Sequence, residues 1–269
     1  MRESAPILSA LRARLAKHAP DRATGRVEGA SAIMALGHAP LDAYLDGGLR
    51  RGQLHEIFAE EGEDEGAAAG FVAMLGILAQ SRGSSRKPLL WIRTEKAQRR
   101  GGRFHARGFA ELGGDPGSIL LATVPDALAL LRGAADALRC SGLGAVVAEC
   151  HGNPALLNLM ASRRLTLAAE QSGVTALMLR PGGTPAPSTA HTRWSISAAP
   201  SRPLEANAPG APAFDLTLLR RRAGPAGKSW RLEWDRDRRT FDEPKISGAP
   251  LSVPVGGQGP DLPAIPLSA

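Results

Sequence analysis

The sequence predicts an α/β protein with a mostly parallel sheet flanked by helices, followed by antiparallel strands near its carboxyl end. Two observations carry this prediction. Between residues 41 and 179, short apolar runs alternate with segments whose apolar residues recur at helical spacing, which is typical of a parallel sheet covered on both faces. Between residues 192 and 235, three runs instead alternate apolar and polar residues, as half-exposed antiparallel strands do.

Composition sets the broad class. The 269 residues are 43% hydrophobic, enough for one globular core with some length left for tails. No apolar run approaches the roughly 20 residues that span a bilayer, and charges interrupt the first 19 residues, so we expect neither a membrane span nor a signal peptide. Cys140 and Cys150 lack metal-ligand spacing and are expected to be reduced core thiols of a cytoplasmic protein. The net charge of +7 permits a nucleic-acid or acidic partner.

Residues 1–40 are expected to form an N-terminal helix and a linker. Apolar residues recur at helical spacing over residues 4–18 with Arg and Lys between them, which predicts a short amphipathic basic helix. Two interpretations of this helix stay open, because it can pack on its own domain or dock on another protein. Residues 19–40 are rich in Gly, Ala and Pro, and we expect a linker there with at most one short strand.

Residues 41–235 are expected to form the core. The parallel strands are expected at residues 53–59, 89–93, 118–124, 144–149 and 175–179. The helices between them are expected at residues 67–81, 126–140 and 156–171. Pro125 supports the start of the second helix, since proline is favoured at a helix amino terminus.

The end of the chain changes in pattern. Antiparallel strands are expected at residues 192–198, 214–222 and 229–235. The Gly-Pro-rich residues 223–227 predict a turn that joins the last two strands into a hairpin. Residues 236–269 are rich in Pro, Gly and Ser with little apolar periodicity, so a disordered tail is expected there.

The loop after the first strand has an unusual charge. A phosphate-binding loop reads G-x-x-x-x-G-K-[ST], because backbone N–H groups cradle phosphates, a Lys neutralises them and a hydroxyl holds Mg²⁺. The corresponding loop here has no Lys, Ser or Thr, and its five carboxylates would repel a triphosphate. This degenerate loop consists of Glu60, Glu61, Gly62, Glu63, Asp64, Glu65 and Gly66. We therefore expect no nucleotide cofactor. Three interpretations stay open: a solvated turn, a phosphate mimic that docks on a basic partner, and an unusual metal or nucleotide site.

Basic residues gather in two places. Residues 82–107 contain nine Lys or Arg and a single acid, and Arg220 and Arg222 share one face of a later strand. Within the first stretch, the residues closest together are Arg99, Arg100, Arg103 and Arg107. These arginines are candidates for contact with a DNA backbone or a partner, and the alternatives are a solvated face for the first group and a charge-protected edge strand for the second.

Catalytic patterns are missing from the sequence. There is no G-x-S-x-G elbow and no Ser-His-Asp spacing, and the six His residues are scattered. We therefore expect no catalytic residue, no resident metal and no enzymatic activity.

Three segments resemble RecA-family cores. Leu41 to Ile57, LDAYLDGGLRRGQLHEI, resembles the entry of those cores, where L-D-x-x-L-x-G-G-L-x-x-G precedes the P-loop strand. Residues 145–149 (AVVAE) sit where such cores carry an apolar strand that ends in a Walker B acid, and residues 172–179 resemble the strand that follows. The resemblance spans residues 41–235. It implies a RecA-like fold in which Glu149 is a relic of the Walker B acid; a Mg²⁺ role is the alternative.

Within that superfamily, a core without the P-loop Lys resembles the ImuA family. Residues 218–222 (LLRRR), a Gly-rich turn and residues 230–234 (WRLEW) also resemble the carboxyl end of ImuA proteins. The resemblance implies a non-catalytic adaptor in SOS-induced translesion DNA synthesis, an error-prone DNA repair process. The implied partners are ImuB, a Y-family-like protein, and an error-prone C-family DNA polymerase; RecA itself is a further candidate.

Two other functions stay open at this point. One is a divergent RecA-like ATPase that borrows Lys87 or Lys96, against which the acidic loop argues. The other is a cell-division inhibitor of the SulA type, since SulA is also RecA-like without a P-loop Lys. SulA proteins are shorter and would not need residues 199–269.

Overall fold

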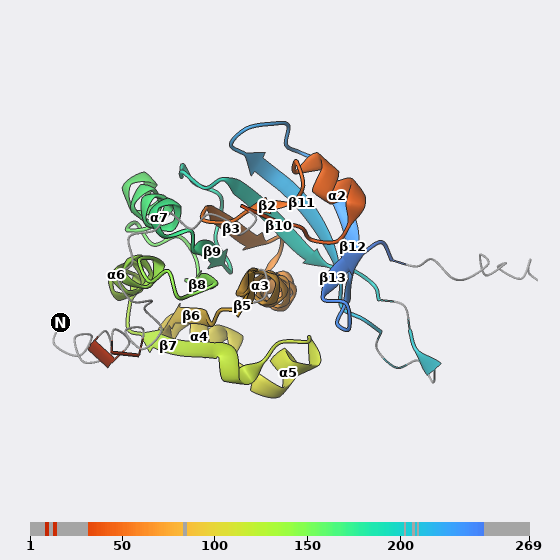
Figure 1. Cartoon of the computed structure of the whole chain (residues 1–269), viewed down its shortest axis with the longest axis horizontal. Coiled ribbons are helices and arrows are strands. Elements are labelled where there is room, and N and C mark those ends of the chain that lie inside the picture. The colour runs from red at the N-terminus through yellow and green to blue at the C-terminus, as the bar shows by residue number, and fades with distance from the viewer. Residues whose placement is uncertain are drawn as a thin grey trace, which may run out of the picture.

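The computed structural model describes residues 32–82, 85–201, 203–205, 208 and 210–244, together with residues 9–10 and 13–14. These residues form a nine-stranded sheet with helices on both faces (Figure 1). Across the sheet the strand order is β13-β12-β11-β10-β3-β9-β8-β6-β7. The predicted α/β class, with a mostly parallel sheet, is confirmed.

Six neighbouring strands of this sheet run parallel. They are β10 (Thr192–Ala198), β3 (Leu54–Ala59), β9 (Thr175–Arg180), β8 (Ala145–Glu149), β6 (Leu89–Thr94) and β7 (Ile119–Val124). Their carboxyl ends lie along one edge of the sheet, and the chain crosses from β3 past β9 and β8 to reach β6. Open α/β sheets bind ligands at this edge, beside the point where the strand order reverses.

Three antiparallel strands complete the sheet: β11 (Ala213–Arg221), β12 (Ser229–Asp235) and β13 (Thr240–Asp242). The antiparallel carboxyl-terminal strands are thus confirmed for β11 and β12. β10 needs a correction, because it pairs antiparallel with β11 but parallel with β3.

The expected start of a tail at residue 236 is also corrected. A turn with Arg239 at φ 52° returns the chain, and Phe241 of β13 is fully buried. A three-residue strand with one apolar side chain has no periodicity that the sequence could reveal. Residues 245–269, where the rest of the tail was expected, lie outside the described residues.

Six α-helices have described bounds: α2 (Ala39–Tyr44), α3 (Glu65–Gln80), α4 (Glu95–Gly101), α5 (Ala106–Glu111), α6 (Ala127–Leu138) and α7 (Leu159–Ser172). Two short 3-10 helices, η1 (Gly62–Asp64) and η2 (Pro116–Ser118), precede α3 and β7. Two small ribbons pair β1 (Ile33–Met34) with β2 (Leu49–Arg50) and β4 (Ser81–Arg82) with β5 (Ser85–Arg86). Of these helices, α2, α4 and α5 were not predicted from the sequence.

The core begins earlier than the expected boundary at residue 41. β1 pairs with β2, and the Asp42 carboxylate accepts hydrogen bonds from the backbone N–H groups of Leu36 and Gly37, each at 2.9 Å. The second glycine of the G-G-L motif, Gly48, is required by the fold. Its φ is 132°, and a Cβ at this position would come within 2.3 Å of the Met34 carbonyl oxygen. Of the expected N-terminal helix, only residues 9–10 and 13–14 are described, and these are helical.

The two faces of the sheet differ in their packing. On one face, rings from the antiparallel strands pack around α3: Phe241 lies 5.3 Å from Phe71 and 4.8 Å from Trp234, measured between ring centroids. On the other face, α6 and α7 pack with mainly Ala, Leu and Val side chains. None of the helices in the described ranges is long and apolar enough to cross a membrane.

Candidate functional site

The acidic loop lies at the sheet edge where a nucleotide would bind, and one of its carboxylates is part of the fold. Residues Gly62–Asp64 form η1 between β3 and α3. Asp64 is buried; its Oδ1 accepts a hydrogen bond from the Ala198 N–H at 2.8 Å, and its Oδ2 accepts one from the Glu61 N–H at 3.2 Å. These bonds tie the loop to the end of β10. The solvated-turn interpretation therefore fits Glu60, Glu61 and Glu63, which are exposed, and fails for Asp64.

Glu65 lies between the loop and the end of β8. It is the first residue of α3, and its Oε1 lies 3.2 Å from Nε2 of His151, which follows β8 by two residues. Gly182 covers the same histidine so closely that an added Cβ would come within 2.9 Å of its ring. A carboxylate and an imidazole thus occupy the front of the helix terminus that binds phosphate in a P-loop protein.

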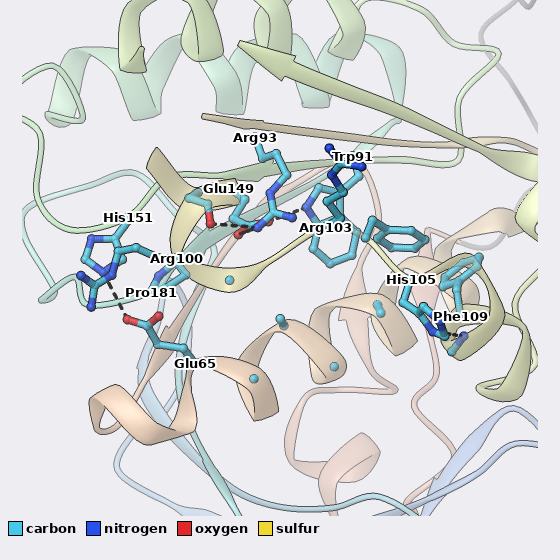
Figure 2. Close-up of a pocket in the computed structure, with 18 of the residues that line it drawn as sticks. Glu65, Trp91, Arg93, Arg100, Arg103, His105, Phe109, Glu149, His151 and Pro181 are labelled. Atoms are coloured by element: carbon cyan, nitrogen blue, oxygen red, sulfur yellow. Dashed lines mark hydrogen bonds and ion pairs between the residues drawn. The ribbon is translucent and has the colours of Figure 1, made fainter. Parts of the chain in front are cut away.

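Glu149, the expected relic of a Walker B acid, is engaged by protein groups at both oxygens. Its Oε1 accepts a hydrogen bond from Arg93 Nη2 and its Oε2 accepts one from Trp91 Nε1, each at 2.7 Å (Figure 2). Both donors belong to β6, so the carboxylate turns toward β6 and away from β3. Burial raises the pKa of Glu149, and the Arg93 charge opposes this shift. The sequence analysis found neither partner, although Arg93 also lies near the end of an apolar strand.

A cavity of about 600 Å³ lies beside this pair, between α3 and the α4–α5 segment. Its apolar wall is a row of rings, with centroids 5.5 Å apart for Trp91 and Phe104 and 5.4 Å apart for Phe104 and Phe109. Arg93 and Glu149 also line it, as do Arg100 and Arg103 (Figure 2).

The four arginines of the predicted patch lie on α4, on α5 and in the connection between them, and two of the four are paired with acids. Arg99 pairs with Glu95 at 3.3 Å, and Arg107 pairs with Glu111 at 3.8 Å, all on the exposed surface. Arg100 and Arg103 line the cavity, and within the described part of the chain neither forms an ion pair. Fewer arginines are therefore available to contact DNA or a partner than the sequence suggests. The short α4 and α5 that carry it begin at side-chain caps, where Thr94 Oγ1 accepts from the Ala97 N–H and His105 Nδ1 accepts from the Gly108 N–H.

Arg220 and Arg222 lie elsewhere, at the end of β11, with four strands of the sheet between β11 and β6. Arg220 donates a hydrogen bond to the Ser188 carbonyl oxygen at 2.9 Å, and Arg222 pairs with Glu170 at 3.4 Å. β12 pairs with β11 only over residues 213–217, whereas β10 pairs with β11 as far as Arg221. The interpretation as an edge strand protected by charge therefore applies only to residues 219–221. The two arginine groups do not form one surface along the sheet.

The two lysines of the ATPase hypothesis differ in position. Lys87 precedes β6, so about 20 Å of strand separates it from the loop edge, and its Nζ donates to the Ser141 carbonyl oxygen at 2.5 Å. Lys87 therefore cannot replace the P-loop Lys. Lys96 lies in the first turn of α4 at the carboxyl edge and is exposed.

No set of three or more His, Cys, Asp or Glu side chains in the described residues is arranged to hold a metal ion. Cys140 is half-buried and Cys150 is buried, and burial raises the pKa of the Cys150 thiol, which keeps it protonated at neutral pH.

Comparison with protein-family models and with curated proteins finds no match. Among solved structures, the chain is similar to the crystal structure of the RadB recombinase, with a TM-score of 0.51 and 14% sequence identity. The match covers 78% of this chain and 99% of the RadB chain. At this identity the likeness concerns the fold alone, and it is a RecA-like fold. The expectation of a RecA-like core is confirmed.

Proposed function

We propose that this protein is a non-catalytic RecA-like accessory protein in SOS-induced translesion DNA synthesis. It works in the cytosol with an ImuB-like Y-family protein and an error-prone C-family DNA polymerase, and the RecA-like core serves as a rigid surface that brings these partners together. A role in DNA repair agrees with the fold, which a recombinase shares. The specific accessory role rests on the resemblance of the sequence to ImuA proteins.

One observation carries the non-catalytic part of the proposal. At the sheet edge where a RecA-like ATPase would hold its nucleotide, the two buried acidic groups already have partners inside the chain. Asp64 is bound to Ala198, and Glu149 is bound to Arg93 and Trp91. Mg²⁺ in such sites binds through one or two carboxylates and the substrate phosphates, and here Glu149 has no free oxygen and the loop offers no cationic side chain.

Calorimetry with Mg-ATP on the purified full chain tests this part. We expect no heat of binding at nucleotide concentrations up to about 1 mM, the range of weak affinities. Glu149→Gln should behave identically. Micromolar binding together with hydrolysis that Glu149→Gln abolishes would contradict the proposal and establish a divergent ATPase, with Lys96 as the first residue to examine.

Recovery of partners tests the accessory role. The tagged full chain, expressed in DNA-damaged cells, should retain a Y-family-like protein and a C-family polymerase, and a tagged unrelated RecA-like ATPase should not retain this pair. Recovery of a tubulin-like division protein in their place would support the SulA-type function instead. Loss of both expected partners would overturn the accessory role even if ATP does not bind.

A further inference from the structure

The outer surface of α6 and α7 gathers exposed apolar side chains. These two helices are neighbours on one face of the sheet (Figure 1). Eight large hydrophobic side chains are exposed among the described residues, and four of them line one groove between α6 and α7. They are Leu128 (40% exposed), Leu156 (48%), Met160 (62%) and Leu167 (46%). Contiguous exposed apolar surface of this kind marks interaction sites in soluble proteins, whereas single exposed hydrophobic residues need no explanation.

The core does not require this apolar surface. α6 already packs on the sheet through its inner face, with Leu130, Ala134 and Leu138 buried. A helix at the surface of a protein normally carries polar residues on its outer face. The outer face of α6 instead carries the exposed Leu128 and the half-buried Leu131 and Ala135, which also pack against the core, beside two charged residues. The exposed part of this face, which includes Leu128, is therefore free to serve binding.

The groove has the dimensions of a helix-binding site. It encloses about 780 Å³, and its α6 lining residues extend from Leu128 to Arg139. Eleven helical steps correspond to roughly 16 Å, which is the length of three turns of an occupant helix. Grooves of this kind take an amphipathic helix whose large apolar side chains recur at positions i, i+3 or i+4, and i+7.

The charges around the groove favour an acidic occupant. Three arginines line it (Arg132, Arg139 and Arg164) against one acid, Asp136, which pairs with Arg139 at 3.2 Å. In the described part of the chain, Arg132 and Arg164 form no ion pair. An occupant with Asp or Glu beside its apolar residues would complement this rim.

The charged segments of this chain itself do not fit. Residues 4–18 have the required apolar spacing, but they carry Arg12, Arg14 and Lys17 and no acid. The acidic loop at residues 60–65 has no large apolar side chain. We propose that the α6–α7 groove binds an acidic amphipathic helix of a partner protein. This inference does not depend on the identity of the partner or on the fate of ATP.

Three synthetic helical 14-residue peptides test the proposal by fluorescence anisotropy with the full chain. The first has Leu at positions i, i+3 and i+7 flanked by Glu; the second keeps the Leu residues and replaces Glu by Lys; the third keeps Glu and replaces Leu by Ser. We expect the first peptide to bind with a micromolar Kd at low salt, and the other two to bind at least tenfold more weakly. Met160→Ser should weaken the first peptide at least tenfold, and Arg164→Glu should reverse the preference between the Glu and Lys peptides.

Leu204→Ser is the matched control, because Leu204 is 62% exposed like Met160 but lies outside the groove; it should leave binding unchanged. Absence of binding by the first peptide at 100 μM, equal binding of the first two peptides, or binding that Met160→Ser does not change would each overturn the proposal. Binding that appears only after Leu11→Glu would identify the chain's own N-terminal segment as the occupant and would overturn it as well. ATP calorimetry and partner recovery are separate measurements, so failure here leaves the proposed function standing.

Discussion

The α3 side of the sheet and the outer surface of α6–α7 handle polar and apolar groups in opposite ways. On the α3 side, polar side chains are buried and hydrogen-bonded within the chain. Glu149 accepts from Arg93, and Asp64 accepts from the backbone of β10. On the outer surface of α6–α7, apolar side chains such as Met160 are exposed and have no described cover. Burial of a charge costs free energy unless it is paired, and exposure of an apolar group costs free energy unless it is later covered.

This difference indicates which surface of the molecule remains available to bind a partner. On the side that would perform nucleotide chemistry in a RecA-like ATPase, Glu149 and Asp64 are engaged by bonds within the chain, so these polar groups contribute to stability. The outer surface of α6–α7 contributes little to stability and keeps its binding capacity. A change on the α3 side should therefore reduce stability, and a change on the outer surface of α6–α7 should reduce only binding.

The largest effect is expected from the buried ion pair. Arg93→Met leaves the Glu149 carboxylate buried without its cation, and breaking a buried pair in this way costs about 3–5 kcal/mol. Urea denaturation followed by circular dichroism gives the free energy of unfolding. The double variant Arg93→Met/Glu149→Gln removes the uncompensated charge and keeps an oxygen that can accept from Trp91 Nε1, so it should recover at least half of the loss. A single variant as stable as the wild type would show that the α3 side does not depend on this pair.

The second prediction concerns His55, which points to the α3 side as Ile57 does two residues later. Its ring nitrogens lie 2.7 Å from Thr192 Oγ1 and 2.9 Å from the Arg50 carbonyl oxygen, and Thr192 Oγ1 accepts from Trp194 Nε1. Burial lowers the pKa of His55 from 6.5 to about 4. The folded state therefore binds fewer protons than the unfolded chain between these values, so stability is complete above pH 6.5 and falls as the pH drops toward 4.

The size of this effect follows from the change in the pKa of His55 on folding. At 1.36 kcal/mol for each pKa unit, His55 accounts for about 3 kcal/mol of the stability lost between pH 7 and pH 4. Urea denaturation at a series of pH values measures it, with His55→Gln as the comparison. Between pH 7 and pH 4, the free energy of unfolding of His55→Gln should fall by about 3 kcal/mol less than that of the wild type. Any pH dependence that remains in the variant belongs to other groups, including His191, whose pKa burial also lowers to about 4. Parallel slopes for the two proteins would contradict the prediction.

An intermediate effect is expected in the acidic loop, where neighbouring acids should differ. Asp64→Ala leaves the backbone N–H of Ala198 without its acceptor, which costs about 1–3 kcal/mol. Glu63→Ala removes an exposed side chain with no described bond, and its effect should stay within about 0.5 kcal/mol. Thermal and urea unfolding of the two variants give this difference. Equal losses would mean that the loop is held by its total charge and not by Asp64.

The sequence predicted the fold from features that repeat over several turns or residues. The apolar run at residues 145–149 and the helical pattern at residues 126–140 are long enough to identify a strand and a helix. α4 and α5 contain seven and six residues, fewer than two full turns, so they have no readable periodicity and depend on caps at Thr94 and His105. The sequence therefore showed the basic residues of this region but not the helices that carry them.

The candidate site was only partly predictable for a related reason. The loop chemistry follows from adjacent residues, and its lack of Lys, Ser and Thr is visible directly. The partners of Glu149 depend on strand order, because Arg93 is 56 residues away and becomes a neighbour only when β6 pairs with β8. The α6–α7 groove also requires the structure, since the helical pattern of α6 alone does not tell which of its apolar residues remain exposed.

The smallest effect on stability is expected on the outer surface of α6–α7. Met160→Ser removes a side chain that is 62% exposed, and surface substitutions of this kind change the free energy of unfolding by about 0.5 kcal/mol or less. Leu130→Ala, on the inner face of α6 with a fully buried side chain, should cost about 2–5 kcal/mol in the same urea assay. If Met160→Ser were as destabilising as Leu130→Ala, the outer apolar residues would belong to the core, and the contrast between the bonded polar groups of the α3 side and the exposed apolar surface would fail. A negligible change in stability together with loss of peptide binding would assign these residues to recognition, because the two faces of one helix would then have separable roles.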